Sequence, residues 1–108
     1  MKVIIKKPGQ LGYEKDIPNT LEALQTEVGG YIEVVHINSR MLAIVNEEGR
    51  LLNLPGNDCG LVGTIVYCAE DGEEFTDINA EQAEILLAGY APVRCVTDPQ
   101  TGGDVYVR

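Results

Sequence analysis

Apolar runs separated by turn residues divide the first half of the chain into short segments. Residues 2–6 (KVIIK) and 31–37 (YIEVVHI) are rich in β-branched residues, which predicts a strand in each. Residues 41–45 (MLAIV) follow after a short polar turn, so an antiparallel hairpin with 31–37 is expected. Because both runs are almost continuously apolar, this hairpin should lie in a sheet with little exposure on either face. Residues 50–54 are expected to return as a further short strand.

A first helix is predicted after the polar connector that ends at Pro18. Asn19 is expected to cap this helix, with Glu22 as its capping-box partner. Gly29-Gly30 should end it, because glycine tolerates the left-handed conformation at a helix C-terminus. Its apolar face is expected to consist of residues at helical spacing: Leu21, Leu24 and Val28.

The second half of the chain predicts another strand and a second helix. The strand covers 61–69 and ends at the turn formed by 70–72, after an irregular loop at 55–60. The helix is expected to begin after Asn79, with Gln82 at the capping-box position. Its apolar stripe is expected to consist of Ala83, Leu86, Leu87 and Tyr90, with Gly89 near its end.

The last residues predict a final hairpin, in which 93–96 pair with 104–107 around a turn at 98–103. The order of elements is therefore β α β β β β α β β. Strands that follow one another through short turns favour an antiparallel or mixed sheet, so residues 1–108 are predicted to form a single α+β domain with about six or seven short strands and two helices. A chain of 108 residues has the length of one ordinary domain.

Acidic residues outnumber basic ones and are unevenly distributed. The formal net charge is −9, and no Lys or Arg occurs from Leu51 to Val93. Such a field repels phosphate backbones, so direct binding to nucleic acid is not expected. The candidate partner-binding acidic face consists of Glu70, Asp71, Glu73, Glu74, Asp77, Glu81 and Glu84. A solvated surface that only aids solubility is the plain alternative.

The cysteines, Cys59, Cys68 and Cys95, form no C-x-x-C motif, which favours thiols in a reducing compartment. The first residues lack the apolar run of a signal peptide, and no stretch is long and apolar enough to span a membrane. A cytoplasmic protein without membrane contact is therefore expected. Ligand spacings typical of zinc and calcium sites are missing, as are phosphate-binding glycine motifs, so no metal and no cofactor is predicted.

The loop between the predicted strands at 50–54 and 61–69 contains the best candidate for a ligand site. Its polar residues are Asn53, Asn57 and Asp58, whose amides and carboxylate could recognise a small ligand. Asn and Gly also dominate loops for conformational reasons alone, which is the alternative interpretation.

A nucleophile–base pair of Cys59 and His36 is a further hypothesis, because Cys59 lies in a glycine-flanked loop. His36 is expected on the same side of its strand as Ile32 and Val34, where a partly buried structural histidine is the simpler interpretation. Cysteine enzymes need the two groups within hydrogen-bond reach and a third group that orients the base. The spacing secures neither condition, so a non-enzymatic role is favoured.

Two stretches of the chain carry a family resemblance. One is the octet 28–35 (VGGYIEVV), preceded by 17–21 (IPNTL); the other is the later pattern of Asn46-Glu47-Glu48-Gly49, Leu54-Pro55, Asn57 and Gly63-Thr64. Together they resemble a family of small proteins of unknown function from bacteria, their phages and mobile elements. The resemblance covers about residues 2–88 and implies a phage or mobile-element context and a cytoplasmic setting. It implies no activity and no catalytic residues, although the Asn57 match adds interest to its loop.

The leading hypothesis is a non-enzymatic accessory protein of a phage or mobile element that acts by binding another protein. In one version, the acidic half imitates nucleic acid and occupies the basic groove of a host defence enzyme, so the expected partner is a basic host protein. The alternative is a small-ligand or nucleotide-binding module that uses the loop from Asn53 to Asp58. A homodimer through exposed strand edges is a further expectation.

Overall fold

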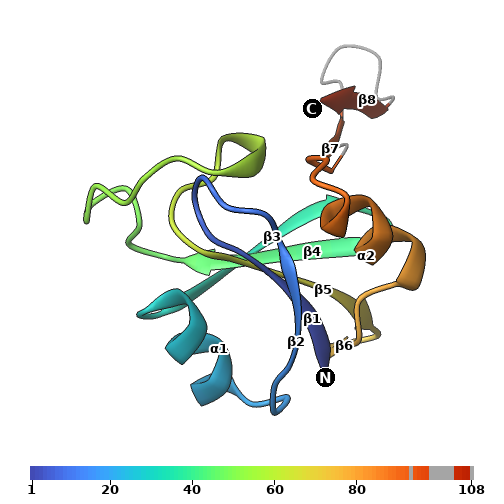
Figure 1. The fold of residues 1–108 in the computed structure, drawn as a ribbon. Coiled ribbons are helices and arrows are strands. Elements are labelled where there is room, and N and C mark those ends of the chain that lie inside the picture. Colours follow the sequence, from blue (N-terminus) through green and yellow to red (C-terminus); the bar gives the residue numbers. More distant parts are fainter. Residues whose placement is uncertain (93, 98–103, 108) are drawn as a thin grey trace.

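The computed structural model of the protein describes residues 1–92, 94–97 and 104–107. Its main element is a six-stranded sheet in which every strand pair is antiparallel (Figure 1). The sheet runs in the order β2 (Tyr13–Asp16), β1 (Lys2–Lys6), β5 (Ile65–Asp71), β4 (Met41–Asn46) and β3 (Ile32–Asn38), and β6 (Glu74–Thr76) pairs with the end of β5. With two helices added, this confirms the predicted α+β class.

The two helices cover opposite faces of the sheet. Leu24 and Val28 of α1 (Leu21–Val28) pack into one apolar cluster, and Ala83 and Leu86 of α2 (Ala80–Leu87) pack into the other. Consecutive residues of β1, β4 and β5 enter the two clusters alternately, so these strands are buried on both sides. This explains why their sequences read as continuous apolar runs rather than alternating ones.

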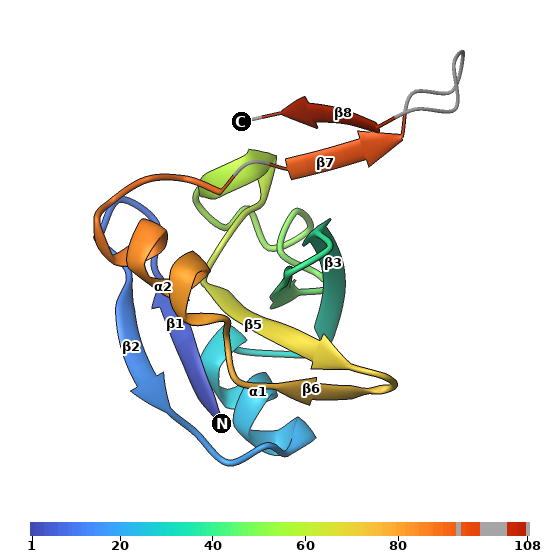
Figure 2. The same ribbon diagram turned by 90° about the vertical axis from the view of Figure 1, so that its right-hand side faces the viewer.

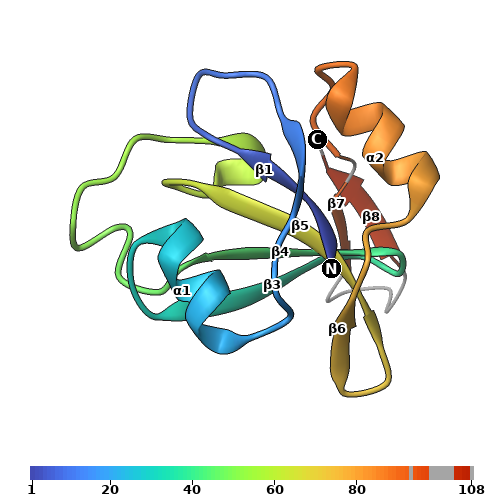
Figure 3. The ribbon, with the colours of Figure 1, turned by 60° about the horizontal axis from the view of Figure 1, so that its bottom comes forward.

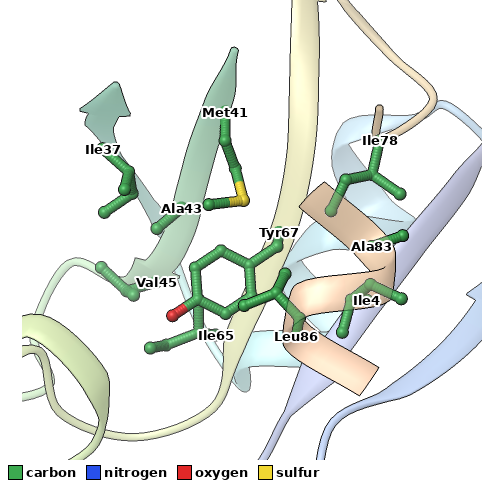
Figure 4. Packing of buried hydrophobic residues seen from close by; sticks show 10 residues of the cluster. All are labelled: Ile4, Ile37, Met41, Ala43, Val45, Ile65, Tyr67, Ile78, Ala83 and Leu86. Atoms are coloured by element: carbon green, nitrogen blue, oxygen red, sulfur yellow. The ribbon is translucent and has the colours of Figure 1, made fainter. Parts of the chain in front are cut away.

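Tyr67 of β5 occupies the centre of the α2-side cluster (Figure 4). Its ring lies among residues of the sheet and α2, including Ile4, Met41 and Leu86, and its side chain is fully buried. Since the chain contains no tryptophan and a single phenylalanine, this tyrosine is the largest ring in a mostly aliphatic core. Its hydroxyl needs a polar partner at the edge of the cluster, as buried hydroxyls generally do.

The N-terminus of α1 differs from the prediction by one residue. Thr20, rather than Asn19, is the N-cap, because its Oγ1 accepts a hydrogen bond from the backbone N–H of Ala23 at 3.2 Å. Asn19 instead donates from Nδ2 to the carbonyl oxygen of Phe75 at 2.9 Å, a contact with a distant strand that the local pattern could not indicate. The predicted capping box of Asn19 with Glu22 is therefore wrong.

The predicted apolar face of α1 is only partly buried. Leu24 and Val28 are in the core, whereas Leu21 is 54% exposed at the start of the helix. Gly29 ends the helix with φ 79° and ψ 25°, as predicted for a glycine C-cap.

α2 begins as predicted and ends earlier. The Oδ1 of Asn79 accepts hydrogen bonds from two backbone N–H groups of the first turn. Of the predicted stripe, Ala83 and Leu86 are buried, but Leu87 and Tyr90 are exposed. Tyr90 lies beyond the last helical residue, so helical periodicity no longer applies to it.

Two strand predictions change. Residues 50–53 form turns and residue 54 lies in no strand, and Asn53 adopts a left-handed φ of 54°. The strand predicted at 61–69 is β5, which covers Ile65–Asp71 and so includes two residues of the turn predicted at 70–72. The strands β2 and β6 were not predicted because their sequences, YEKD and EFT, carry few apolar residues. Both are edge segments that take their backbone hydrogen bonds from one neighbour.

β3 is more exposed than its apolar sequence suggests. It lies at the edge of the sheet, where Val34 and His36 are open to solvent on the α1 side. The His36 side chain is 66% exposed, and its Nε2 lies 3.3 Å from Oε1 of Glu70. The expectation of a partly buried histidine is therefore wrong, and the expected burial on both faces holds for β4 but not for β3.

β7 (Arg94–Thr97) and β8 (Asp104–Val107) form a separate two-stranded antiparallel sheet after α2 (Figure 2). The predicted final hairpin is confirmed for these two strands. Residue 93 and the predicted turn at 98–103 lie outside the described residues. β2 and β3 end the main sheet on either side, and the homodimer through such edges stays a prediction.

Candidate functional site

Most of the predicted acidic residues lie on or beside the hairpin of β5 and β6. Figure 3 shows this hairpin projecting from the body of the molecule, below the sheet. Ala69 pairs with Thr76 at its base, and Gly72 turns the chain at its tip with φ 64°, a conformation that glycine adopts without strain. We call residues Glu70–Glu74 the acidic hairpin.

The acidic hairpin carries carboxylates on both strands and in the turn: Glu70, Asp71, Glu73 and Glu74, all exposed. Asp71 lies directly opposite Glu74 in the strand register. Like charges at directly opposed positions destabilise a β-hairpin. Within the described part of the chain, no Lys or Arg forms an ion pair with either of them, so the opposition is not offset there.

The other predicted acidic residues have partners or lie on α2. Asp77 accepts a hydrogen bond from the backbone N–H of Lys2 at 2.8 Å, which ties the end of β6 to β1. Glu81 lies 3.3 Å from the guanidinium of Arg40. Glu84 lies on α2, where it is exposed. The sequence-based face therefore divides into the acidic hairpin, one structural aspartate and two helical glutamates.

The structure adds a groove of mixed polar and apolar lining beside the acidic hairpin. It has a volume of about 310 Å³ and lies between the start of α1 and β6. Leu21, Leu24 and Phe75 line it together with Glu73 and Glu74. The sequence pattern does not indicate this groove, because helical spacing places Leu21 on the apolar face of its helix and the residues of β6 carry no strand signal. The only available signal was an isolated phenylalanine directly after two glutamates.

The amide of Asn57 is used within the protein itself. Its Nδ2 donates to the carbonyl oxygens of Lys6 at 2.9 Å and Gly63 at 2.8 Å, and its Oδ1 accepts from the backbone N–H of Asp58 at 2.8 Å. The amide thus joins the end of β1 to both sides of the loop. Binding of a small ligand by Asn57 would have to compete with these bonds, and the predicted ligand role stays a prediction.

Asp58 and Asn53, the other two predicted ligand residues, have different surroundings from Asn57. Oδ2 of Asp58 accepts a hydrogen bond from the hydroxyl of Tyr67 at 3.0 Å, which satisfies the buried tyrosine. Asn53 is an exposed turn residue. Burial and the nearby carboxylate of Asp58 raise the pKa of Tyr67 well above its usual range.

Cys59 and His36 are not arranged as a catalytic pair. Cys59 packs against the α2-side cluster, and its Sγ lies 3.6 Å from the carbonyl oxygen of Pro92. His36 is paired in register with Leu42, a member of the α1-side cluster, so its side chain lies on the other face of the sheet. Cys68 is buried within β5, where burial raises the pKa of its thiol to about 12. Such a thiol is a poor nucleophile.

No group of three or more His, Cys, Asp or Glu residues lies close enough together to hold a metal ion in the part of the chain described. No helix there has the length and apolar character needed to cross a membrane.

Comparison with known proteins places the chain in a family. The family model "Domain of unknown function (DUF3846)" matches residues 1–91, which include the main sheet and both helices. The chain belongs to this family. No curated protein and no solved structure matches it. The matched region of this DUF3846 member contains the acidic hairpin and the groove, whereas β7 and β8 follow it.

Proposed function

We propose that this protein is a non-enzymatic binding protein of a phage or mobile element, and that its acidic hairpin binds a basic surface of a host protein. The observation that supports the proposal best is the opposition of Asp71 and Glu74 across the hairpin. The arrangement lowers stability, and a basic partner would remove that repulsion on binding.

The partner that suits such a surface is a protein with a nucleic-acid-binding groove. Grooves of this kind concentrate lysine and arginine, and their field attracts a dense group of carboxylates as it attracts phosphates. The acidic hairpin projects from the sheet (Figure 3), so it can enter a concave surface. We propose that it occupies the nucleic-acid groove of a host defence enzyme and thereby competes with the nucleic acid.

The ligand-binding alternative has less support. It depends on the loop from Asn53 to Asp58, yet the Asn57 amide is engaged by Lys6 and Gly63. Two cations reach this region, and both are engaged by groups of the protein itself. Lys6 Nζ lies 3.4 Å from Asn57 Oδ1, and Arg50 Nη2 donates to the carbonyl oxygen of Gly60 at 3.1 Å.

The test is affinity capture from a nuclease-treated host lysate with three forms of the tagged protein. These are the wild type, the acidic-hairpin variant Glu73→Lys/Glu74→Lys, and the control Glu14→Lys/Glu47→Lys, which has the same net charge but leaves the hairpin intact. The same basic protein should be captured by the wild type and the control, and not by the hairpin variant. The complex should dissociate between about 0.1 M and about 1 M salt, because the Debye length falls from about 10 Å to about 3 Å.

The captured protein is then tested for competition with its nucleic acid. The wild type should displace a labelled oligonucleotide from it, and the hairpin variant should not. A partner captured equally by all three forms, or one that keeps its oligonucleotide when the wild type binds, would contradict the proposed function.

A further inference from the structure

The groove beside the acidic hairpin has an apolar floor and an acidic rim. Leu24 is buried and forms part of the floor, Phe75 is half-buried, and Leu21 is largely exposed at one side. The exposed Glu73 and Glu74 also line it, together with Asn19 and Thr20. Among the residues that the structure describes, none of those lining the groove is cationic.

The walls of the groove are held together by a hydrogen bond between distant segments. Asn19, directly before the N-cap of α1, donates from Nδ2 to the carbonyl oxygen of Phe75 in β6 at 2.9 Å. The helix start and the hairpin are therefore joined at this point. A side chain entering the groove meets surfaces already in position, which limits the ordering that binding requires.

We propose that this groove receives an arginine side chain of the basic partner. The inference rests on the proposed function and names the group that is recognised. The aliphatic stem of an arginine would pack against Leu21 and Phe75, and its guanidinium would reach the carboxylates of Glu73 and Glu74. Long cationic side chains commonly cover apolar surface in this way while their charged end stays at a polar rim.

Two arguments select arginine over other occupants. A second copy of this chain also carries a net charge of −9, so its approach to an acidic rim is repelled. Between the two cations, the guanidinium is more weakly hydrated than an ammonium, stacks on aromatic rings and offers a planar fork of donors to carboxylates. The position of Phe75 next to both glutamates suits these properties better than those of lysine.

A titration with short peptides tests the groove itself. The probes are blocked Gly-Arg-Gly, its lysine counterpart and its citrulline counterpart, which keeps the shape of arginine without the charge. Amide chemical shifts of the ¹⁵N-labelled protein report the site. The arginine peptide should shift residues 19–24 and 73–75, lysine should do so more weakly, and citrulline should not. Shifts spread evenly over all acidic residues, equal effects of arginine and lysine, or no shifts would each overturn the inference.

Variants separate the groove from the charge of the hairpin. Leu21→Ser removes the apolar side and keeps every carboxylate, and Leu87→Ser is its control because Leu87 is an exposed leucine on the other helix. Leu21→Ser and Glu74→Gln should each weaken arginine-peptide binding about two- to fivefold, whereas Leu87→Ser and Glu14→Gln should leave it unchanged. Unchanged binding in Leu21→Ser would refute the apolar contribution.

Failure of the groove can be told from failure of the proposed function. If the acidic hairpin captures a basic partner in a salt-sensitive way but the arginine peptide does not bind the groove, only the further inference is wrong. If charge reversal of the hairpin has no effect on partner capture, the proposed function is wrong as well.

Discussion

Asp71 and Glu74 face each other across the strands β5 and β6, two carboxylates at directly opposed positions of one hairpin. Cross-strand neighbours are close enough for their charges to interact, and equal charges there oppose pairing of the strands. The hairpin forms in spite of this repulsion, with Gly72 at its turn and the apolar residues of β5 anchoring it in the core. The same pair of carboxylates is expected to lower the stability of the fold and to contribute to partner binding. Substitutions in the pair can therefore be tested by unfolding and by partner capture.

Glu74→Lys should stabilise the protein while it removes partner binding. The change replaces repulsion of Asp71 by attraction, so the free energy of unfolding should rise by about 0.2–1 kcal/mol. Urea denaturation measures this rise. Glu14→Lys alters the net charge equally, and Glu14 faces Ile4 rather than another acid. A gain of the same size in both variants would mean that net charge, not the opposed pair, is responsible.

Asn57→Ala should destabilise the fold. It removes the donors to the carbonyl oxygens of Lys6 and Gly63 and leaves partly buried acceptors without those bonds. The expected loss in the free energy of unfolding is about 1–3 kcal/mol. Asn53→Gly is the matched control, since Asn53 is exposed and has a left-handed φ that glycine adopts freely. If Asn57→Ala were as stable as the wild type, the structural role assigned to this amide would be wrong.

Stability should fall at alkaline pH because of Cys68. Burial raises its pKa from 9.0 to about 12, so the folded state keeps a proton that the unfolded state loses. The contribution is fully present below pH 9.0 and is lost progressively as the pH rises toward about 12. Equilibrium unfolding at several pH values should show a shallower decline in Cys68→Ala than in the wild type over this window. Tyr67, whose pKa is also raised, adds a decline that remains in this variant.

The two glycines after α1 should respond to alanine for different reasons. Gly29 has φ 79° and open space at the Cβ position, so Gly29→Ala should cost about 1–2 kcal/mol through its left-handed backbone alone. At Gly30, an added Cβ would lie 2.9 Å from Nδ2 of Asn46, a buried side chain that donates to the carbonyl oxygen of Val28. Gly30→Ala should cost about 1–3 kcal/mol through crowding.

Substitution of the neighbouring asparagine separates these two causes. Asn46→Ala makes room at Gly30, so the double variant should lose less stability than the sum of the single variants, while pairing Asn46→Ala with Gly29→Ala should be additive. Thermal unfolding of the five variants gives both comparisons. Additivity in both pairs would show that crowding by Asn46 is not the reason for glycine at position 30.

The sequence by itself determined the α+β class, the strands β1, β3 and β4, and the positions of both helices. These elements carry their own signals, because apolar runs must be buried and caps and glycines act on their immediate neighbours. The cap at Asn79 and the helix stop at Gly29 were predicted for this reason. The acidic residues of the candidate surface could also be named from the sequence, since charge is a property of composition.

Only the tertiary structure decided what these residues face. The strands β2 and β6 exist because β1 and β5 offer them backbone partners, which no local pattern of YEKD or EFT encodes. Asn19 does not cap α1 but donates to a carbonyl oxygen in β6. Asn57 donates to the carbonyl oxygen of Lys6 and so joins its loop to the end of β1. The opposition of Asp71 and Glu74 and the groove beside it arise in the same way, from strand register and from packing between segments distant in sequence.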